Sequence, residues 1–302
     1  MTVLFNKVVV VGVGLIGGSF ALALKHAGAV GHVVGVGRSA SVLARAVELG
    51  IIDQVATSLA DALDGADMVL IATPVAQTGP ILAALAPLLE PHTIVTDAGS
   101  TKSDVVAAAR TALGTRIAQF VPGHPIAGRE ANGPDAALSD LYVNKKTILT
   151  PLPENSDAMV EQVAAAWRAC GAVVCRLAPE QHDRIFAAVS HLPHLLAYAL
   201  VDQIAQAPQS DELFHYAASG FRDFTRIAGS SPEMWRDIAL ANRDALLAEL
   251  NIYGTQIAKL QVLLSQADGA GLKAMFGNAQ RARHAWLNTI EAAERPNRNG
   301  GN

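Results

Sequence analysis

A glycine pattern near the start of the chain restricts the fold more than any other feature of the sequence. Four valines, Val8–Val11, run directly into Gly12-Val13-Gly14-Leu15-Ile16-Gly17 and then into an apolar segment with helical spacing. Glycines at this spacing between a strand and a helix permit a tight turn, a close approach of a pyrophosphate to the backbone, and close packing of the helix on the strand. The helix N-terminus then attracts negative charge. The sequence therefore predicts a dinucleotide-binding turn at the start of an α/β domain.

The expected cofactor site also includes the ends of two later strand-like runs. We expect cofactor contacts at Gly12, Gly14, Leu15, Ile16, Gly17, Thr73 and Pro74. The second run ends in Val36-Gly37-Arg38-Ser39, where an NAD-preferring site places an acid for the ribose 2′-hydroxyl. Arg38 can instead pair with a 2′-phosphate and Ser39 can add a hydrogen bond, which favours NADP. If Arg38 is only a solvated loop charge, NAD is accepted through other contacts, and this alternative stays open.

The first 178 residues alternate strand-like and helix-like segments. Short runs rich in β-branched residues, apolar without interruption, occupy residues 8–12, 32–37, 67–74, 93–99, 146–151 and 172–177. Such runs, separated by helical segments, are typical of parallel strands that are covered on both faces. The sequence predicts an α/β domain of the Rossmann type, with a mostly parallel sheet, over residues 1–178.

Strand signals stop at Pro179, and the segments that follow have helical spacing with few breakers. Pro232 after Ser230-Ser231 indicates a helix start, with a serine as N-cap and proline in the first turn. The sequence predicts an all-α domain over residues 179–293, followed by a disordered polar tail at residues 294–302.

Composition and charge narrow the classes of partner. Of the 302 residues, 51% are hydrophobic, and the formal net charge of −4 comes from scattered acids and bases. Neither nucleic acid nor a membrane surface is expected as a partner. No secretory signal is readable, and apolar stretches such as residues 81–89 end well before the roughly 20 residues of a membrane span. Two cysteines fit buried thiols better than a disulfide framework, so we expect a cytoplasmic protein with a small-molecule partner.

Polar residues gather in three stretches of otherwise apolar sequence, at residues 97–104, 122–128 and 182–198. Ser100 follows a strand-like run and precedes a helical segment, which places it at the carboxyl edge of the sheet, where open α/β folds bind ligands. His124 follows another short apolar run at the same edge. It is either a loop imidazole satisfied by backbone or, since Gly123 and Pro125 fix its loop, part of a lined cleft.

The third stretch and its downstream neighbour offer further polar groups. His191 and His194 lack a third ligand at suitable spacing, so no metal site is expected. Arg222 and Arg226 lie beside aromatic residues, where a guanidinium can bind a carboxylate through two hydrogen bonds. We favour an internal ion pair with Asp223 for Arg222, and ligand binding for Arg226.

Together these motifs resemble the prephenate/arogenate (cyclohexadienyl) dehydrogenase family of tyrosine biosynthesis, over almost the whole chain. The motifs are Gly12-x-Gly14-Leu-Ile-Gly17-Gly18-Ser19, Asp97-x-x-Ser100-x-Lys102, Gly123-His124-Pro125-x-Ala127-Gly128, Ser190-His191-Leu-Pro-His194 and Gly220-Phe-Arg-Asp-x-Thr-Arg226-Ile-Ala. The resemblance implies an NAD(P)-dependent oxidoreductase, with a nucleotide-binding domain and a helical domain that binds substrate and forms a homodimer.

The resemblance also implies a role for individual residues. His124 matches the histidine that takes the proton of the ring 4-hydroxyl, and Ser100 matches a serine that holds the same hydroxyl. Arg226 matches the arginine on the ring carboxylate that is lost as carbon dioxide, and Trp235 lies at the matching offset beyond it. One of His191 and His194 faces the substrate in the family; we favour His194.

The implied reaction suits these residue types. Oxidation of the 4-hydroxyl gives a vinylogous β-keto acid, which decarboxylates because the ring becomes aromatic, so the protein need only position the hydroxyl, accept its proton and orient the carboxylate. The sequence leaves open the choice between prephenate and arogenate, for which Glu130, Asn132 and Asp135 are candidate contacts, and inhibition by tyrosine. Two other readings stay open, a dehydrogenase of the β-hydroxyacid type and an NADP-sensing protein without catalysis.

Overall fold

The structure, a computed structural model, describes residues 3–129 and 131–294. By its internal contacts the chain divides into two compact units, one that reaches to Leu246 and one that begins at Leu247. The predicted boundary between residues 178 and 179 stays a prediction. The polar tail predicted at residues 294–302 lies outside the described residues from residue 295 onward.

A six-stranded parallel sheet forms the centre of the first unit, in the order β3-β2-β1-β4-β5-β6. Its strands are β1 (Phe5–Val11), β2 (Val30–Val36), β3 (Gln54–Val55), β4 (Met68–Ile71), β5 (Ile94–Asp97) and β6 (Phe120–Val121). The connecting helices are α1 (Leu15–His26), α2 (Ala40–Glu48), α3 (Leu59–Leu63), α4 (Thr78–Leu85), α5 (Ser103–Leu113) and α6 (Asp157–Ala169), with short 3₁₀ turns at Val75–Gln77, Ala86–Leu88, Gly114–Gln119 and Pro134–Ala136.

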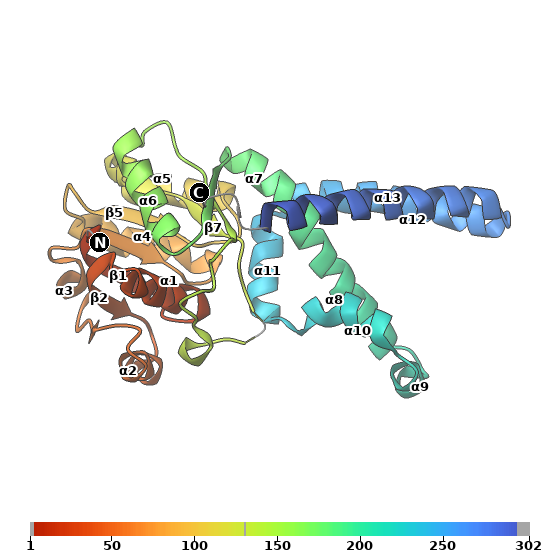
Figure 1. Ribbon diagram of the computed structural model, residues 1–302, viewed down its shortest axis with the longest axis horizontal. Coiled ribbons are helices and arrows are strands. Elements are labelled where there is room, and N and C mark those ends of the chain that lie inside the picture. The colour runs from red at the N-terminus through yellow and green to blue at the C-terminus, as the bar shows by residue number, and fades with distance from the viewer. Residues whose placement is uncertain (1–2, 130, 295–302) are drawn as a thin grey trace, which may run out of the picture. The chain divides into compact units, whose positions relative to one another are not determined.

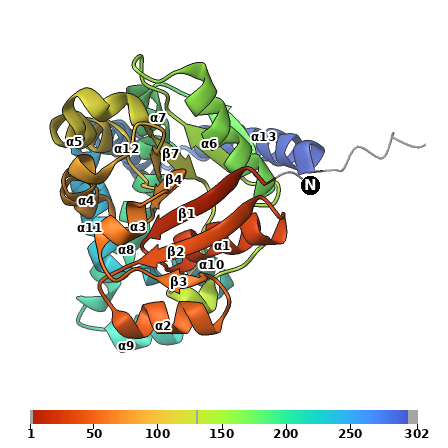
Figure 2. The ribbon, with the colours of Figure 1, turned by 90° about the vertical axis from the view of Figure 1, so that its left-hand side faces the viewer.

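Both faces of this sheet are covered by helices (Figure 2). Val8 and Val10 pack into one apolar cluster with α1 and α6, whereas Val9 and Val11 pack into a second cluster with α4 and α5. Successive side chains of a strand point to opposite faces, so burial on both faces requires an unbroken apolar run. The predicted α/β fold with a mostly parallel sheet is confirmed.

The last two strand-like runs belong to a different sheet from the one expected. Three strands, β7 (Gly123–Pro125), β8 (Lys146–Leu149) and β9 (Val173–Arg176), form a separate sheet in the order β7-β8-β9. β7 pairs antiparallel with β8, and β8 pairs parallel with β9. An apolar run reports that a strand is buried but not which sheet it joins, because strand pairing depends on contacts distant in sequence. β3 and β6 have two residues each, which is too few for a strand pattern to be recognised in the sequence.

From Pro179 onward the described chain is helical. The first unit continues through α7 (Pro179–Phe186), a π-helical turn (Ala187–His191), α8 (Leu192–Ala205), α9 (Ser210–His215), α10 (Ser219–Thr225), a 3₁₀ turn (Arg226–Gly229) and α11 (Pro232–Ala241), as Figure 1 shows. The predicted start of α11 is confirmed, since the Ser231 hydroxyl accepts from the Met234 amide and Pro232 is in the first turn. The second unit contains most of α12 (Arg243–Ser265) and α13 (Gly269–Glu294).

One helical run departs from the expectation that apolar stretches are short. In the described part of the chain, Pro179–Ala205 is the stretch long and apolar enough to span a membrane, with a mean hydropathy of 1.4 over its most apolar window. Length and composition are the only grounds for that reading. His182, Asp183 and His191 of this run are buried and hydrogen-bonded within the protein, as described below.

Candidate active site

The glycine turn after β1 has the geometry of a phosphate-binding turn. Gly12 adopts a φ of +98°, and a Cβ there would lie 2.7 Å from the carbonyl oxygen of Ala72. A Cβ on Gly17 would lie 2.2 Å from the carbonyl oxygen of Gly12, so α1 packs closely on the turn because residue 17 has no side chain. A Cβ on Gly14 would meet nothing within 4 Å. Gly14 is thus the open position at the N-terminus of α1, where a pyrophosphate fits.

A cavity of about 800 Å³ lies along the end of β2. Its lining includes Gly12, Gly14, Thr73 and Pro74 of the expected cofactor site, together with Arg38 and Ser39. Arg38 is exposed, and no carboxylate is present among the described lining residues. The Ser39 hydroxyl caps α2 by accepting from the Val42 amide at 3.3 Å, so it already has a structural role. Leu43, Leu59 and Ile81 give the cavity an apolar wall that suits an adenine ring.

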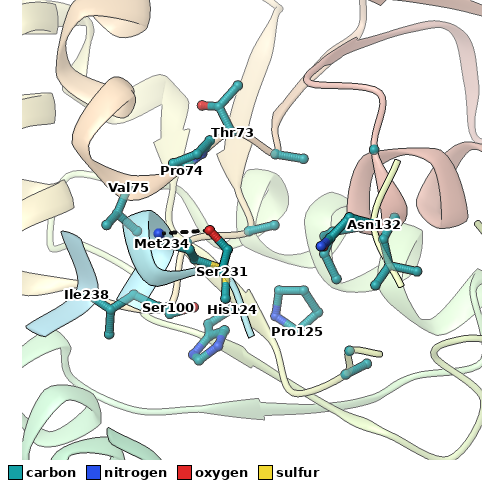
Figure 3. Close-up of a pocket in the computed structure, with 18 of the residues that line it drawn as sticks. Thr73, Pro74, Val75, Ser100, His124, Pro125, Asn132, Ser231, Met234 and Ile238 are labelled. Carbon is teal, nitrogen blue, oxygen red and sulfur yellow. Dashed lines mark hydrogen bonds between the residues drawn. The ribbon is translucent and has the colours of Figure 1, made fainter. Parts of the chain in front are cut away.

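A second cavity, of about 470 Å³, adjoins the first at Gly14, Ala72, Thr73 and Pro74. It continues past Leu15 and Ile16 to Ser100 and His124, and Met234 and Ile238 of α11 line it as well. Figure 3 shows Ser100, His124 and Pro125 around this cavity, with Asn132 on the other side of Pro125. The structure therefore brings the dinucleotide turn, the serine and the histidine of the sequence prediction around one connected space.

A buried ion pair fixes Ser100 relative to His124. Asp97 and Lys102, which are 1% and 0% exposed, form this pair across the turn that contains Ser100. Asp97 accepts from the amides of Gly99 at 2.8 Å and Gly123 at 3.0 Å, and Lys102 donates to the Gly123 carbonyl at 2.7 Å. Because buried charges are stable only when paired and hydrogen-bonded, this network holds the end of β5 and the start of β7 in one geometry.

His124 is held by a chain of hydrogen bonds that the sequence analysis missed. Its Nδ1 lies 2.8 Å from Nε2 of His182, and Nδ1 of His182 lies 2.8 Å from Oδ1 of Asp183. Asp183 also accepts from the amides of Lys102 and Ser103 at the start of α5, each at 2.8 Å. Burial alone would raise the pKa of Asp183, but the bonds from His182, Ser103 and Lys102 lower it to about 2, so the group is a carboxylate.

The hydrogen bonds that join Asp183, His182 and His124 determine the tautomers of both imidazoles. A carboxylate only accepts, so His182 donates through Nδ1–H and its Nε2 accepts. His124 must then donate through Nδ1–H, which leaves the lone pair on its Nε2. Burial lowers the pKa of His124 well below its ordinary value, and the positive charge of Lys102 acts in the same direction. His124 is therefore a neutral imidazole with an unprotonated nitrogen available as a proton acceptor.

His191 lies behind the cavity wall rather than on it. It is 1% exposed, and its Nδ1 accepts from the Asn242 amide at 3.1 Å, while the same amide group donates to the Asp183 carbonyl at 2.8 Å. Burial lowers the pKa of His191 to about 4, and His182 contributes. Through Asn242, His191 is thus linked to α7, the helix that contains Asp183.

His194 and Trp235 form a stacked pair. The ring centroids are 3.6 Å apart with an angle of 20° between the planes, and the His194 Nδ1 donates to the Ser190 carbonyl at 2.9 Å. Trp235 is 8% exposed and packs with Val75 and Ile238, both of which line the cavity. Neither ring is itself part of the described lining. Burial lowers the pKa of His194, and the charge of Arg226 contributes.

The two arginines of the α10 region differ in surroundings. Arg222 is 80% exposed and lies 3.7 Å from Asp223, the ion pair expected from the sequence. Arg226 begins the 3₁₀ turn before α11 and is outside the described lining of the cavity, although its charge acts on His194. Of the three candidate specificity residues, Asn132 lines the cavity, Asp135 is paired with Arg45 of α2 at 2.8 Å, and Glu130 lies outside the described residues.

The missed residues had only a weak sequence signal. His182 and Asp183 stand in a stretch already marked as polar, but His182 is 58 residues from His124 in sequence. Asn242 and Arg129, which also lines the cavity, belong to no motif that was singled out. Among residues 3–129 and 131–294, no group of three or more His, Cys, Asp or Glu side chains is placed to hold a metal ion.

Comparisons with known proteins agree with this geometry. A family model described as prephenate dehydrogenase, nucleotide-binding domain, matches residues 20–176, and one described as prephenate dehydrogenase, dimerization domain, matches residues 178–278. A cyclohexadienyl dehydrogenase of Zymomonas mobilis is 36% identical over 94% of this chain and 97% of its own length.

Two solved structures share the fold over the same extent. Prephenate dehydrogenase from A. aeolicus, in complex with hydroxyphenyl propionate and NAD+, has a TM-score of 0.86 and 37% identity, over 93% of this chain and 98% of its own. Synechocystis arogenate dehydrogenase has a TM-score of 0.78 and 32% identity, over 93% of this chain and 99% of its own.

Proposed function

The chain belongs to the prephenate dehydrogenase family, and on that basis we propose that it oxidises and decarboxylates prephenate, arogenate or both in tyrosine biosynthesis, with hydride transfer to NAD(P)+. The observation that carries the proposal is the connected cavity that joins the glycine turn to Ser100 and His124. A hydroxyl held by Ser100 and His124 lies beside the space that adjoins the dinucleotide turn, which is the arrangement that hydride transfer requires.

The proposed mechanism uses His124 as the general base. Its unprotonated Nε2 accepts the proton of the ring 4-hydroxyl, while the Ser100 hydroxyl holds the same oxygen. A nicotinamide dinucleotide bound at the turn supplies the hydride acceptor. As His124 becomes an imidazolium, its Nδ1–H stays bonded to His182, which Asp183 orients. The Asp183 carboxylate stabilises the developing positive charge through this chain without taking a proton itself.

Arg226 is proposed to bind the ring carboxylate that leaves as carbon dioxide. Support comes from its charge, which contributes to the lowered pKa of His194, a ring that stacks on Trp235. His194 is the histidine favoured to face the substrate, since it is half-buried whereas His191 is enclosed. Trp235 then acts by fixing the plane of His194 and the position of Ile238.

NADP is the proposed cofactor in preference to NAD. Arg38 is exposed on the wall of the larger cavity, and that wall has no described carboxylate to bind a ribose 2′-hydroxyl. A guanidinium pairs with a 2′-phosphate through charge-assisted hydrogen bonds. The A. aeolicus structure contains NAD+, so the choice has to be made for this chain by kinetics.

A homodimer and a cytoplasmic location complete the proposal. The second unit exposes large apolar side chains, among them Ile252, Phe276 and Trp286, which suits an interface with a second copy. The dimerization-domain match, over residues 178–278, supports a homodimer and includes Ile252 and Phe276. Cys170 and Cys175 are both free, as is usual in a reducing compartment.

The test is a set of initial rates, followed by absorbance at 340 nm, with prephenate and with arogenate, each against NAD+ and NADP+. We expect strong turnover in at least one combination, and higher kcat/KM with NADP+. Absence of turnover in all four combinations, with nucleotide binding demonstrated by calorimetry, would instead establish a nucleotide-sensing protein without this activity.

A further inference from the structure

We propose that Arg129 selects the substrate side chain, so that the enzyme prefers prephenate, a keto acid, over arogenate, the corresponding amino acid. The inference rests on the proposed function and assigns the part of the substrate that the family motifs leave open. Arg129 follows β7, the strand that contains His124 and Pro125, and it lines the same cavity as Ser100 and His124.

Arg129 is the charged group of this cavity. Among the described lining residues it is the one side chain with a permanent charge, since the other polar side chains are Thr73, Ser100, Asn132, Ser231 and the neutral His124. Arg129 is exposed and has no ion-pair or hydrogen-bond partner within the described residues. A guanidinium remains protonated at any relevant pH, so an unpaired one beside a cavity favours an anionic ligand group.

The orientation of the substrate directs its side chain away from Ser100, toward the part of the cavity that Asn132 lines. Both candidate substrates have the hydroxyl on one ring carbon, and the carboxylate and the side chain on the carbon opposite. If Ser100 and His124 hold the hydroxyl, the side chain points away from Ser100. Figure 3 shows Ser100 and Asn132 on different sides of His124 and Pro125, and Asn132 lines the cavity together with Arg129 and Gly133.

Charge then distinguishes the two substrates. The side chain of prephenate ends in a keto acid with a net charge of −1, whereas that of arogenate is a zwitterion with no net charge. A guanidinium attracts the side chain of prephenate. With arogenate, its attraction for the carboxylate is opposed by its repulsion of the ammonium. No described carboxylate lines this cavity to bind the ammonium.

The experiment compares kcat/KM for prephenate and arogenate in the wild type, Arg129→Met and Arg129→Lys, at saturating NADP+. We expect Arg129→Met to lower kcat/KM for prephenate by about tenfold, as for loss of one charge-assisted hydrogen bond, with a change of less than about threefold for arogenate. Arg129→Lys should keep most of the preference, because the charge remains. Arg168→Met, at an exposed arginine of α6 that pairs with Glu161, is the matched control and should change neither value.

The contrary outcomes are distinct. Equal losses for both substrates, or a wild type that prefers arogenate, would overturn the assignment. A raised KM for NADP+ in Arg129→Met, with the substrate preference unchanged, would assign Arg129 to the cofactor phosphates instead. A wild type that turns over neither substrate would remove the proposed function itself. Thermal unfolding of each variant identifies a folding defect, in which case Arg129→Lys and Arg129→Gln decide the question.

Discussion

At the scale of single residues, His124 is defined by the groups behind it. The carboxylate of Asp183 fixes the tautomer of His182, and His182 fixes that of His124. Asp183 therefore determines which nitrogen of His124 is unprotonated, although Asp183 does not itself line the cavity. An isolated histidine in a loop would exchange tautomers freely, and only part of its population would be the required base.

Removal of the base should affect turnover more than binding. We expect His124→Ala to lower kcat by about 10²–10⁴-fold, the usual contribution of general acid–base catalysis, and to leave the Kd of NADP+ unchanged.

Arg226→Ala, by contrast, should mainly raise the KM of the substrate through loss of a charge-assisted contact. Steady-state kinetics together with calorimetric cofactor binding measure both effects, and unchanged turnover in His124→Ala would remove His124 from the mechanism.

The enclosed His191 should make folding stability depend on pH. Its pKa is depressed to about 4 in the folded protein, from an ordinary value of 6.5, so the unfolded chain binds its proton first. This dependence lowers the free energy of unfolding as the pH falls from 6.5 to 4, by up to about 3 kcal/mol. Urea unfolding at several pH values measures the slope, and His191→Gln, which keeps an acceptor for Asn242, should reduce it. An equal slope in both proteins would contradict the assignment.

At the scale of elements, Asp183 joins α7 to the start of α5. It accepts from two amides at the N-terminus of α5, next to the buried Asp97–Lys102 pair. The helix N-terminus stabilises the carboxylate, and the carboxylate satisfies amides that have no partner within the helix. The helical region is thereby connected to the edge of the sheet at which Ser100 and His124 lie.

Replacement of this carboxylate should alter the pH profile as well as the rate. In Asp183→Asn, the negative charge that supports the His124 imidazolium is lost, so the pKa of His124 should fall further. We expect kcat to drop at least tenfold and the acidic limb of kcat/KM to move to lower pH. Asp183→Glu should restore part of both values. A loss of stability with an unshifted pH profile would mean that Asp183 is only structural.

The turn between β1 and α1 separates a packing role from a binding role. Gly17→Ala introduces a Cβ 2.2 Å from a backbone oxygen and 2.8 Å from Val10, so α1 must move. We expect a loss of about 1–3 kcal/mol in unfolding free energy, together with weaker cofactor binding. Gly14→Ala meets no protein atom and should unfold like the wild type, yet it should bind NADP+ at least tenfold more weakly. Equal cofactor affinity in Gly14→Ala would place the pyrophosphate elsewhere.

At the scale of the whole molecule, the second unit presents apolar surface that the described chain does not cover. Phe276 is 58% exposed and Trp286 is 59% exposed, on a helix of 26 residues. Large apolar side chains exposed to this extent are typical of association surfaces. The proposed homodimer would remove them from water.

The dimer is tested by a charge on this surface. We expect Trp286→Glu to raise the dimer dissociation constant by at least tenfold, because burial of an unpaired carboxylate in an apolar interface is costly. Sedimentation velocity at several concentrations measures it. Lys259→Glu, also on the second unit but at a charged position, is the control. A wild type that remains monomeric at high concentration would refute the homodimer.

The sequence by itself determined the features that depend on neighbours along the chain. A strand, a glycine turn and a helix are adjacent in sequence, and so are the serine and proline that begin α11, so their patterns predicted the parallel sheet, the dinucleotide turn and the helical second half. Ser100 and His124 were predicted at one edge because the strands before them end there.

Tertiary structure decided what depends on distant contacts. It placed β8 and β9 in a second sheet with β7, set His182 and Asp183 behind His124, linked Asn242 to His191, and directed Asp135 toward Arg45. The contacts of His124 with His182, of Asn242 with His191 and of Arg45 with Asp135 join residues more than 50 positions apart, and their formation depends on how helices pack against the sheet. A local pattern records that a side chain is buried or polar, whereas the partner that it meets is fixed only when the chain is folded.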